Sequence, residues 1–213
     1  LFMPDGDNLH ALPQEAVQLT AQPANDQSQR LFSVTWTPDG TTRVAEGEEG
    51  RRTQEEAFDR GAMACAAQLL GVTGSLIDLG VDYASQRKQF GVAIGSFQAV
   101  KHRLANAKVK LEYARSAVYR AAHSVALNTS GRSVDVSMAK VAAGEAALFA
   151  AKESLQVHGA IGYTYEQDLH IWMKRAWSLD LAFGSGAWHR ARVAEAVIDQ
   201  SLPAETFGYS EPG

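Results

Sequence analysis

The sequence has one cysteine, no proline across most of its length and no excess of positive charge. Cys65 has no second cysteine to form a disulfide with and cannot make a zinc site alone, which fits a reducing compartment such as the cytoplasm. The formal net charge of -4 gives no bulk field for nucleic acid or an anionic membrane. No run of about 18 apolar residues occurs, and the first residues do not form a signal peptide. We therefore expect a soluble, cytoplasmic protein whose partners are small molecules or proteins.

Proline placement divides the chain into two unlike parts. Four prolines lie near the start, and none occurs between residues 39 and 202, which predicts helices there. Residues 31–37 instead read as a strand, closed by the turn sequence Pro38-Asp39-Gly40. We expect a β-rich remnant with a linker at 45–53, together spanning 1–52, and a helical domain over 53–213. The start, without Met and strand-like, suggests that a further N-terminal part precedes it.

The clearest helical periodicity lies in residues 96–127, with Ser96 as the expected N-cap. Apolar residues recur there at alternating steps of four and three: Val100, Leu104, Ala107, Leu111, Ala114, Val118, Ala121 and Val125. Further helices are predicted at 53–87, 133–157, 165–182 and 186–202, and the helix at 133–157 has an alanine-rich face. A short glycine-bearing turn should join the helix at 53–87 to the helix at 96–127. The fold class is mainly α, an antiparallel bundle of four to five helices.

Residue spacing argues against several common kinds of site. A di-iron bundle needs Glu-x-x-His pairs, which the chain lacks, and His158, His170 and His189 stand on separate segments, so no metal site is predicted. The run Gly159–Gly162 follows a helix where a dinucleotide fingerprint must follow a strand. The basic residues of 96–127 are interpreted as a solvated helix face.

Two residue clusters remain that can carry chemistry. In the first, Arg87 could hold a pyrophosphate, Phe90 could pack on a ring, and Gln98 could add a hydrogen bond. In the second, Gln156 precedes Gly159, where the backbone can approach a ligand closely. Each cluster taken alone also fits an ordinary helix end with dipole-compensating groups.

Together these clusters resemble the C-terminal helical domain of acyl-CoA dehydrogenases, flavoenzymes that desaturate acyl-CoA thioesters between the α and β carbons. The matching blocks are YASQRKQFG at 83–91, SFQAVKHRLA at 96–105, QVHGAIGYTYEQDLHIWMKRA at 156–176 and FGSGAWHRAR at 183–192. The resemblance covers about residues 53–202. It implies that the β-rich remnant is the end of the family's central β domain.

The resemblance also implies FAD shared at a subunit interface. The cofactor would be bound mainly by the neighbouring subunit. This chain would contact its adenosine and pyrophosphate half through Arg87, Phe90, Gln98, Gln156 and Gly159. Ala160 stands where the family's second glycine is usual, and its methyl group restricts backbone approach at that contact.

The catalytic carboxylate of the family is missing at both of its usual positions, where this chain has Gly61 and Gly184. The chain thus resembles the non-catalytic subunit of heteromeric α2β2 acyl-CoA dehydrogenases from actinobacterial steroid side-chain degradation. A catalytic partner would then supply the base and bind most of the acyl-CoA, and this chain alone would be inactive. Two alternatives stay open: a homotetrameric dehydrogenase or oxidase relative using Asp59 or Glu166 as base, and a helical scaffold without enzymatic function.

Overall fold

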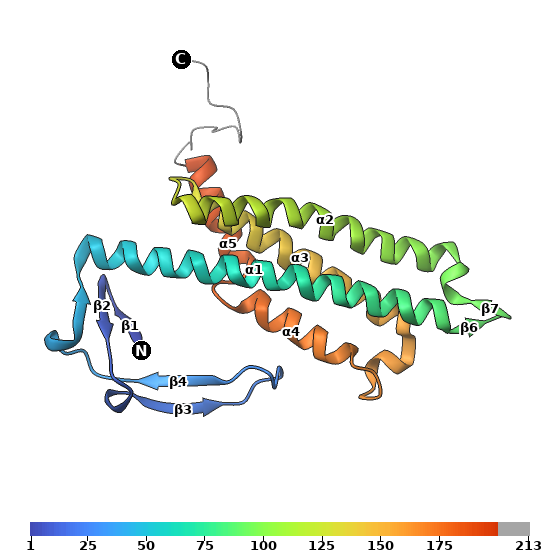
Figure 1. Ribbon diagram of the computed structural model, residues 1–213, viewed down its shortest axis with the longest axis horizontal. Coiled ribbons are helices and arrows are strands. Elements are labelled where there is room, and N and C mark those ends of the chain that lie inside the picture. The colour runs from blue at the N-terminus through green and yellow to red at the C-terminus, as the bar shows by residue number, and fades with distance from the viewer. Residues whose placement is uncertain (200–213) are drawn as a thin grey trace, which may run out of the picture.

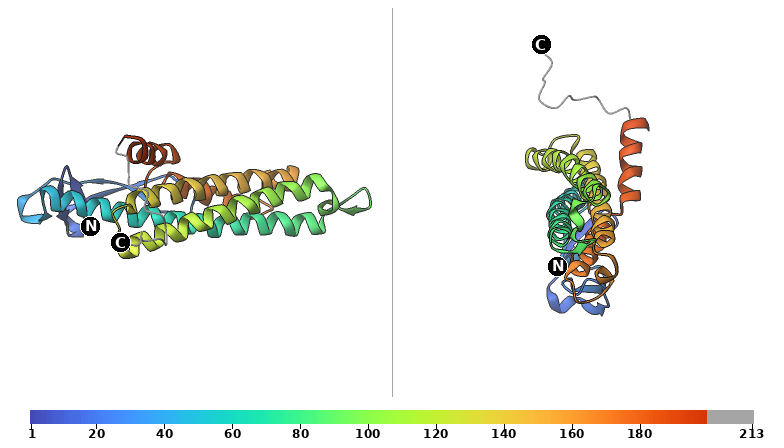
Figure 2. Two further views of the ribbon diagram at one scale, coloured as in Figure 1. Left: turned by 90° about the horizontal axis from the view of Figure 1, so that it is seen from above. Right: turned by 90° about the vertical axis from the view of Figure 1, so that its right-hand side faces the viewer.

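Four helices lie side by side in the computed structural model, which describes residues 1–199 (Figure 1). They are α1 (Gly47–Gln86), α2 (Gln98–Leu127), α3 (Arg132–His158) and α4 (Leu169–Leu181), and successive helices run antiparallel. α5 (Gly186–Ala194), continued by a π-helical turn at Glu195–Asp199, crosses the bundle instead of running along it (Figure 2). The predicted fold, a mainly α antiparallel bundle, is confirmed. The end of the helix predicted at 186–202 lies outside the described residues.

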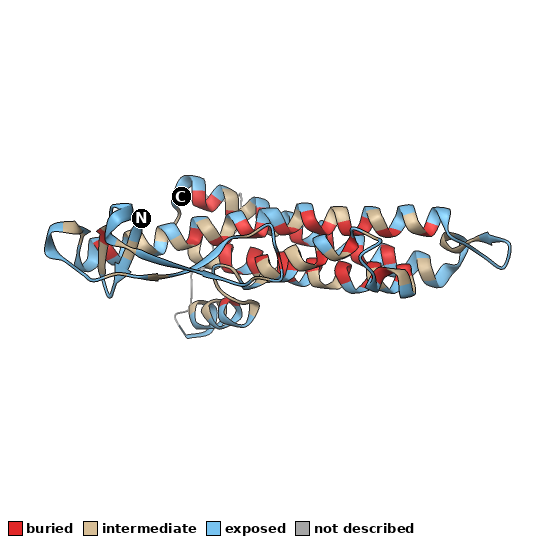
Figure 3. Ribbon diagram, turned by 90° about the horizontal axis from the view of Figure 1, so that it is seen from below, coloured by how far each residue is buried: buried red, intermediate tan, exposed pale blue. Residues whose placement is uncertain are grey.

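The core forms along the faces that the periodicity indicates. All the seam positions of α2 are buried except Val100, which is half-buried. On α3 the small side chains of Ala139, Ala143, Ala146 and Ala150 are buried as well, so α3 packs closely against both α1 and α2. Burial is concentrated between the helices, whereas the β segments are mostly exposed (Figure 3).

Helix α1 begins at Gly47, so the linker predicted at 45–53 is wrong over most of its length. Its polar residues support a helix start instead, because Glu48 and Glu49 lie in the first turn and Arg51 pairs with Glu48 and Glu55. By length and composition α1 could cross a membrane, but 44% of its apolar stretch is buried inside the bundle. The buried apolar residues of α1 share one hydrophobic core with residues of α2, α3 and α4.

The predicted β-rich start forms two small antiparallel sheets. One joins β1 (Phe2–Asp5), β2 (Asn8–Ala11) and β5 (Arg43–Ala45), and the other joins β3 (Gln18–Gln22) and β4 (Leu31–Thr35). The loop of the second sheet is fastened to α4, where Arg175 pairs with Asp26 at 2.9 Å and Ser178 donates to Gln29 at 2.5 Å. The short 3₁₀ turns Gln14–Ala16 and Gly40–Thr42 lie between strands.

The connections between helices differ from the sequence prediction in detail. A hairpin of β6 (Lys88–Gln89) and β7 (Val92–Ala93), then a 3₁₀ turn at Ile94–Ser96, replaces the simple turn after α1. Ser96 is not an N-cap, because its hydroxyl donates to the Ala93 carbonyl at 2.7 Å and Phe97 occupies the cap position. α4 begins four residues later than predicted, after the 3₁₀ segment Gly159–Tyr163.

Candidate functional site

The β6–β7 hairpin holds an aromatic side chain out into solvent. Phe90 has a φ of 53° and Gly91 a φ of 82°, so both turn residues take the left-handed conformation of a tight two-residue hairpin. Phe90 is 92% exposed, although its ring meets Phe97 edge-on at 6.2 Å. A left-handed, exposed phenylalanine is unfavourable both in backbone strain and in solvation, which is typical of a side chain kept for contact with another molecule.

Both predicted clusters lie at the same end of the bundle (Figure 1). Tyr83 near the end of α1 stacks on His158 at the end of α3, with ring centroids 4.4 Å apart. Ala84, Leu104 and Val157 form a small apolar cluster beneath this pair. The C-terminus of α1, the N-terminus of α2 and the C-terminus of α3 are therefore packed together as one surface.

The five predicted cofactor residues occupy exposed or partly exposed places on this bundle end. Arg87 is the C-cap of α1 and Gln98 the first residue of α2, and both are exposed, as is Gln156 in the last turn of α3. Gly159 caps α3 with a φ of 64°, and no atom lies within 4 Å of the place a Cβ would take. These residues present groups that can bind an anionic dinucleotide: a guanidinium, two amides, an aromatic ring and an open backbone.

Gly61 and Gly184, the two positions where a catalytic carboxylate was expected to be missing, lie around the same aromatic residue, Phe183. A Cβ built on Gly61 would lie 2.2 Å from the ring of Phe183, the residue just before Gly184. A Cβ on Gly184 would lie 2.9 Å from Nε2 of His189 and 3.0 Å from the indole of Trp188. Aromatic and imidazole rings thus fill the space that side chains at these positions would need, a contact that no local sequence pattern reveals.

Buried polar groups fix the loop between α4 and α5 in this shape. His189 Nε2 donates to the Phe183 carbonyl at 2.8 Å, and its Nδ1 accepts from the Ser137 hydroxyl at 3.0 Å. Lys140 donates to the carbonyls of Asp180 and Gly184 at 2.7 and 3.2 Å. Burial lowers the pKa of His189 and likewise the pKa of Lys140. The lowered pKa of His189 favours the neutral imidazole, in which Nε2 carries the proton toward the Phe183 carbonyl and Nδ1 is left to accept from Ser137.

Asp59 is not available as a base. Its carboxylate is fully buried and accepts from Arg192 at 2.7 Å, Arg132 at 2.9 Å and Ser133 at 2.7 Å. Burial alone would raise the pKa of Asp59, but these hydrogen bonds outweigh it and hold the pKa below its usual value. A carboxylate bound in this way is a structural ion-pair centre, so the interpretation of Asp59 as a base is wrong.

Glu166 is not near the glycine pair. It lies before α4, whereas Gly184 lies after it, and the 13 residues of that helix span about 20 Å. Glu166 is exposed, and its backbone N–H donates to the Thr164 hydroxyl at 3.3 Å. The two alternative bases considered from the sequence are thus both out of place for chemistry at Gly61 and Gly184.

An open cavity of about 780 Å³ lies in front of the glycine pair, between the first β-sheet and the helices. We call it the aromatic cavity. Its apolar lining includes Phe2, Pro4, Leu9, Phe58, Phe183 and Trp188. In the described part of the chain the carboxylate that lines it is Glu55, whose side chain pairs with Arg51 at 2.8 Å.

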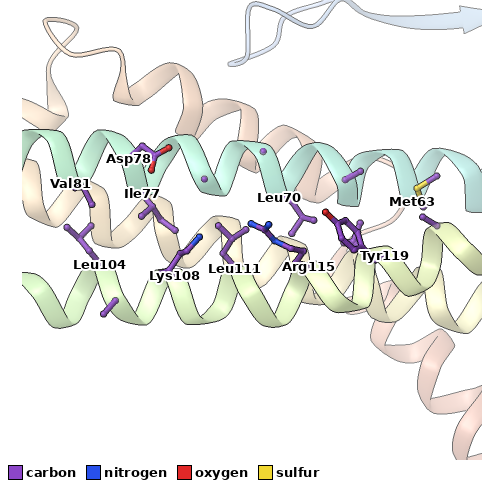
Figure 4. Close-up of a pocket in the computed structure, with 16 residues that line it drawn as sticks. Met63, Leu70, Ile77, Asp78, Val81, Leu104, Lys108, Leu111, Arg115 and Tyr119 are labelled. Carbon is purple, nitrogen blue, oxygen red and sulfur yellow. The ribbon is translucent and has the colours of Figure 1, made fainter. Parts of the chain in front are cut away.

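A second open space is a groove of about 900 Å³ along α1 and α2 (Figure 4). Leu70, Ile77 and Leu111 point into it from the two helices, with Lys108 and Arg115 beside them. Gly71 and Gly74 also line it, and a Cβ built on either would meet no atom within 4 Å. This groove has the shape and apolar floor of a surface against which another helix could pack.

Comparison with protein families gives one decisive match. Residues 48–198 match the model of the acyl-CoA dehydrogenase C-terminal domain. The chain belongs to the acyl-CoA dehydrogenase family. Among the described residues, no group of three His, Cys, Asp or Glu side chains could hold a metal ion.

Two similar proteins are acyl-CoA dehydrogenases of mycobacteria. The chain is 36% identical to acyl-CoA dehydrogenase IpdE2 of Mycolicibacterium smegmatis over 159 residues, which cover 74% of this chain and 46% of the relative. It is 41% identical over 118 residues to acyl-CoA dehydrogenase IpdE2 of Mycobacterium tuberculosis, covering 55% of this chain and 35% of the relative. The chain thus spans less than half the length of these relatives.

Solved structures show the same fold. Butyryl-CoA dehydrogenase from Megasphaera elsdenii matches 89% of this chain and 51% of its own, with a TM-score of 0.82 and 23% identity. The ChsE4–ChsE5 complex from Mycobacterium tuberculosis matches 89% of this chain and 51% of its own, with a TM-score of 0.77 and 25% identity.

Proposed function

We propose that this chain is the base-less subunit of a heteromeric, FAD-dependent acyl-CoA dehydrogenase. The observation that carries the proposal is the contact between Gly61 and the Phe183 ring, with Gly184 next to it. Neither position has a carboxylate, and neither has room for one without a shift of its neighbours. The complex would desaturate an acyl-CoA thioester, and we propose a steroid side-chain thioester as the substrate. We propose the cytoplasm as its location.

The role of this chain's own residues would be to bind the adenosine and pyrophosphate half of FAD. Arg87 would pair with pyrophosphate oxygens, Phe90 would pack on the adenosine, and Gln98 and Gln156 would donate or accept hydrogen bonds. The open backbone at Gly159 would allow close approach. When bound, FAD supplies the acceptor for the hydride that leaves the β carbon.

The partner subunit would provide what this chain lacks. Removal of the α proton needs a carboxylate within hydrogen-bond reach of it, and this must come from the partner's own site. The α1–α2 groove, with its apolar floor and open glycines, offers a surface for a helix of that partner. The likeness to the ChsE4–ChsE5 complex supports a heteromeric arrangement.

The deciding experiment measures size and flavin content together, by multi-angle light scattering and the visible flavin spectrum. We would compare the chain alone with the chain co-expressed with acyl-CoA dehydrogenase subunits encoded beside it. We expect flavin uptake only with a partner, at one flavin for each unlike pair. A flavin-loaded homotetramer that dehydrogenates acyl-CoA without a partner would refute the proposal.

The competing function is a homomeric acyl-CoA dehydrogenase, and one observation favours it. Glu55 lines the aromatic cavity, one and a half helical turns before Gly61. If Glu55 were the base, Glu55→Gln would abolish the dehydrogenation catalysed by the chain alone. Our proposal instead predicts that the chain alone has no dehydrogenase activity.

A further inference from the structure

We propose that Tyr83 and His158, whose rings stack on each other, are positioning residues for the adenosine half of FAD. They would not touch the cofactor themselves and would act by holding Arg87 and Gly159 at a fixed separation. This role rests on the function proposed above, because it concerns the cofactor that the chain would share with its partner.

The residues predicted to bind the cofactor come from separate segments of the chain. Arg87 caps the end of α1 and Gly159 caps the end of α3, and the whole of α2 lies between them in the sequence. A ligand that spans both helix ends binds most tightly when their separation is fixed before it arrives, because no binding energy is then used to order them. A contact that joins the two helix ends is therefore needed.

The stacked rings of Tyr83 and His158 are such a contact. Their centroids lie 4.4 Å apart, and their planes differ by 21°. His158 is 5% exposed and Tyr83 is half-buried, so the ring pair lies within the packed bundle end. Stacked aromatic rings have a preferred relative orientation as well as a preferred distance. The pair thus fixes both the spacing and the rotation of α1 against α3.

The backbone connects each ring to one of the predicted cofactor residues. The carbonyl of Tyr83 accepts from the N–H of Arg87 at 2.9 Å, and this hydrogen bond caps α1. His158 directly precedes Gly159, whose φ of 64° turns the chain out of α3. A shift of the Tyr83 ring would therefore move Arg87, and a shift of the His158 ring would move Gly159.

Buried hydrogen bonds hold His158 on its own helix and tie that helix to α1 a second time. His158 Nδ1 donates to the Ser154 carbonyl at 2.7 Å, and the Ser154 hydroxyl donates to the Leu76 carbonyl at 2.6 Å. Between these two ties lies Gly80, where a Cβ would come within 3.0 Å of the Ser154 hydroxyl. Leu76 and Tyr83 are about two helical turns apart, so the two ties together prevent α1 from sliding or turning against α3.

The test compares the binding of FAD and FMN to the flavin-free complex of the full chain with its co-expressed partner, followed by flavin fluorescence. FMN carries the flavin ring but no adenosine, so its affinity does not depend on the adenosine contacts. Tyr83→Leu and His158→Leu should each weaken FAD binding at least about tenfold and change FMN binding less than about twofold. Tyr83→Phe and His158→Phe keep a stacking ring and should retain FAD binding within about threefold.

Two control variants separate positioning from a general loss of packing. Leu179→Ala removes a side chain that is 2% exposed in α4, far along the chain from both rings. It should lower the denaturant midpoint at least as much as His158→Leu does and leave the ratio of FAD to FMN affinity unchanged. Tyr113→Leu, at a side chain that is 77% exposed on α2, should change neither quantity. Tyr83→Leu, at a half-buried ring, decides the question if His158→Leu does not fold.

An unchanged ratio of FAD to FMN affinity in Tyr83→Leu would overturn the inference, as would an equal change of that ratio in Leu179→Ala. Either result leaves the proposed function intact, because the wild-type complex still binds FAD. A flavin-loaded homotetramer would refute the subunit role alone, since the same ratio measured in its variants still decides the role of the rings. A wild-type chain that takes up no flavin in any assembly would refute both.

Discussion

At the scale of single residues, the buried carboxylate of Asp59 should contribute strongly to stability, because it pairs with two arginines. Asp59→Ala would leave Arg132 and Arg192, whose side chains are 12% and 20% exposed, without their shared carboxylate. Loss of one partner from a buried ion pair costs about 3–5 kcal/mol. Urea unfolding followed by circular dichroism measures this loss. Glu145→Ala removes the exposed Arg190–Glu145 pair and should cost less than about 1 kcal/mol; similar losses in both variants would contradict the assignment.

His189 makes stability depend on pH in a defined window. Burial lowers its pKa, so below about pH 6.5, the ordinary value, the unfolded chain takes up a proton that the native chain does not. The free energy of unfolding should therefore fall as the pH drops from about 6.5 toward the native pKa. Denaturant unfolding at several pH values from about 5 to 7.5 measures the slope. His189→Gln should remove this component, and His102→Gln, on an exposed position of α2, should keep it.

At the scale of elements, Phe90 in the β6–β7 hairpin should strengthen flavin binding but lower the stability of the chain. Phe90→Gly places a residue without Cβ at a φ of 53°, which should stabilise the chain by up to about 1 kcal/mol. The same change removes the exposed ring and should weaken flavin retention in the complex, measured by dilution and absorbance. Gly91→Ala, at a φ of 82°, should instead destabilise by about 1 kcal/mol. Unchanged flavin retention in Phe90→Gly would exclude a cofactor contact by this side chain.

The elements also show what the sequence can and cannot predict. The steps of four and three in α2 predict its buried face, because helical periodicity alone determines which residues share a side. The first turns of α1 could not be predicted, because their glycines and charged residues are typical of a linker. In the structure the charged residues Arg51, Glu48 and Glu55 form ion pairs along a helix. The hairpin escapes it because only Gly91, and not Phe90, belongs to a residue type that normally takes positive φ.

For the site, motif order predicts which residues gather at one end of the bundle but not what fills the space around Gly61 and Gly184. Gly61 and Phe183 are far apart in the sequence and on different elements, and their contact depends on how α4 and α5 return to α1. Local sequence patterns cannot predict such a contact. The identity of Asp59 as an ion-pair centre is hidden for the same reason, since its partners come from α3 and α5.

At the scale of the whole molecule, the α1–α2 groove should decide assembly. Gly74→Leu adds a side chain into open space, so it should not harm the chain and should gain about 0.5–1 kcal/mol in helix propensity. It should also reduce co-purification with the partner subunit, measured by size-exclusion chromatography with light scattering. Gln68→Leu, exposed on α1 but outside the groove, is the matched control. Undiminished assembly in Gly74→Leu would exclude the groove as the partner surface.

The ion-pair centre has a consequence for folding during synthesis. The carboxylate of Asp59 pairs with residues 73 and 133 positions later in the chain, so an emerging polypeptide carries an uncompensated acid on α1 until α3 and then α5 have left the ribosome. The Asp59 centre is therefore complete only after α5 has been synthesised. Chains halted before residue 192 lack the Arg192 contact, so we expect them to be less stable than chains that contain α5.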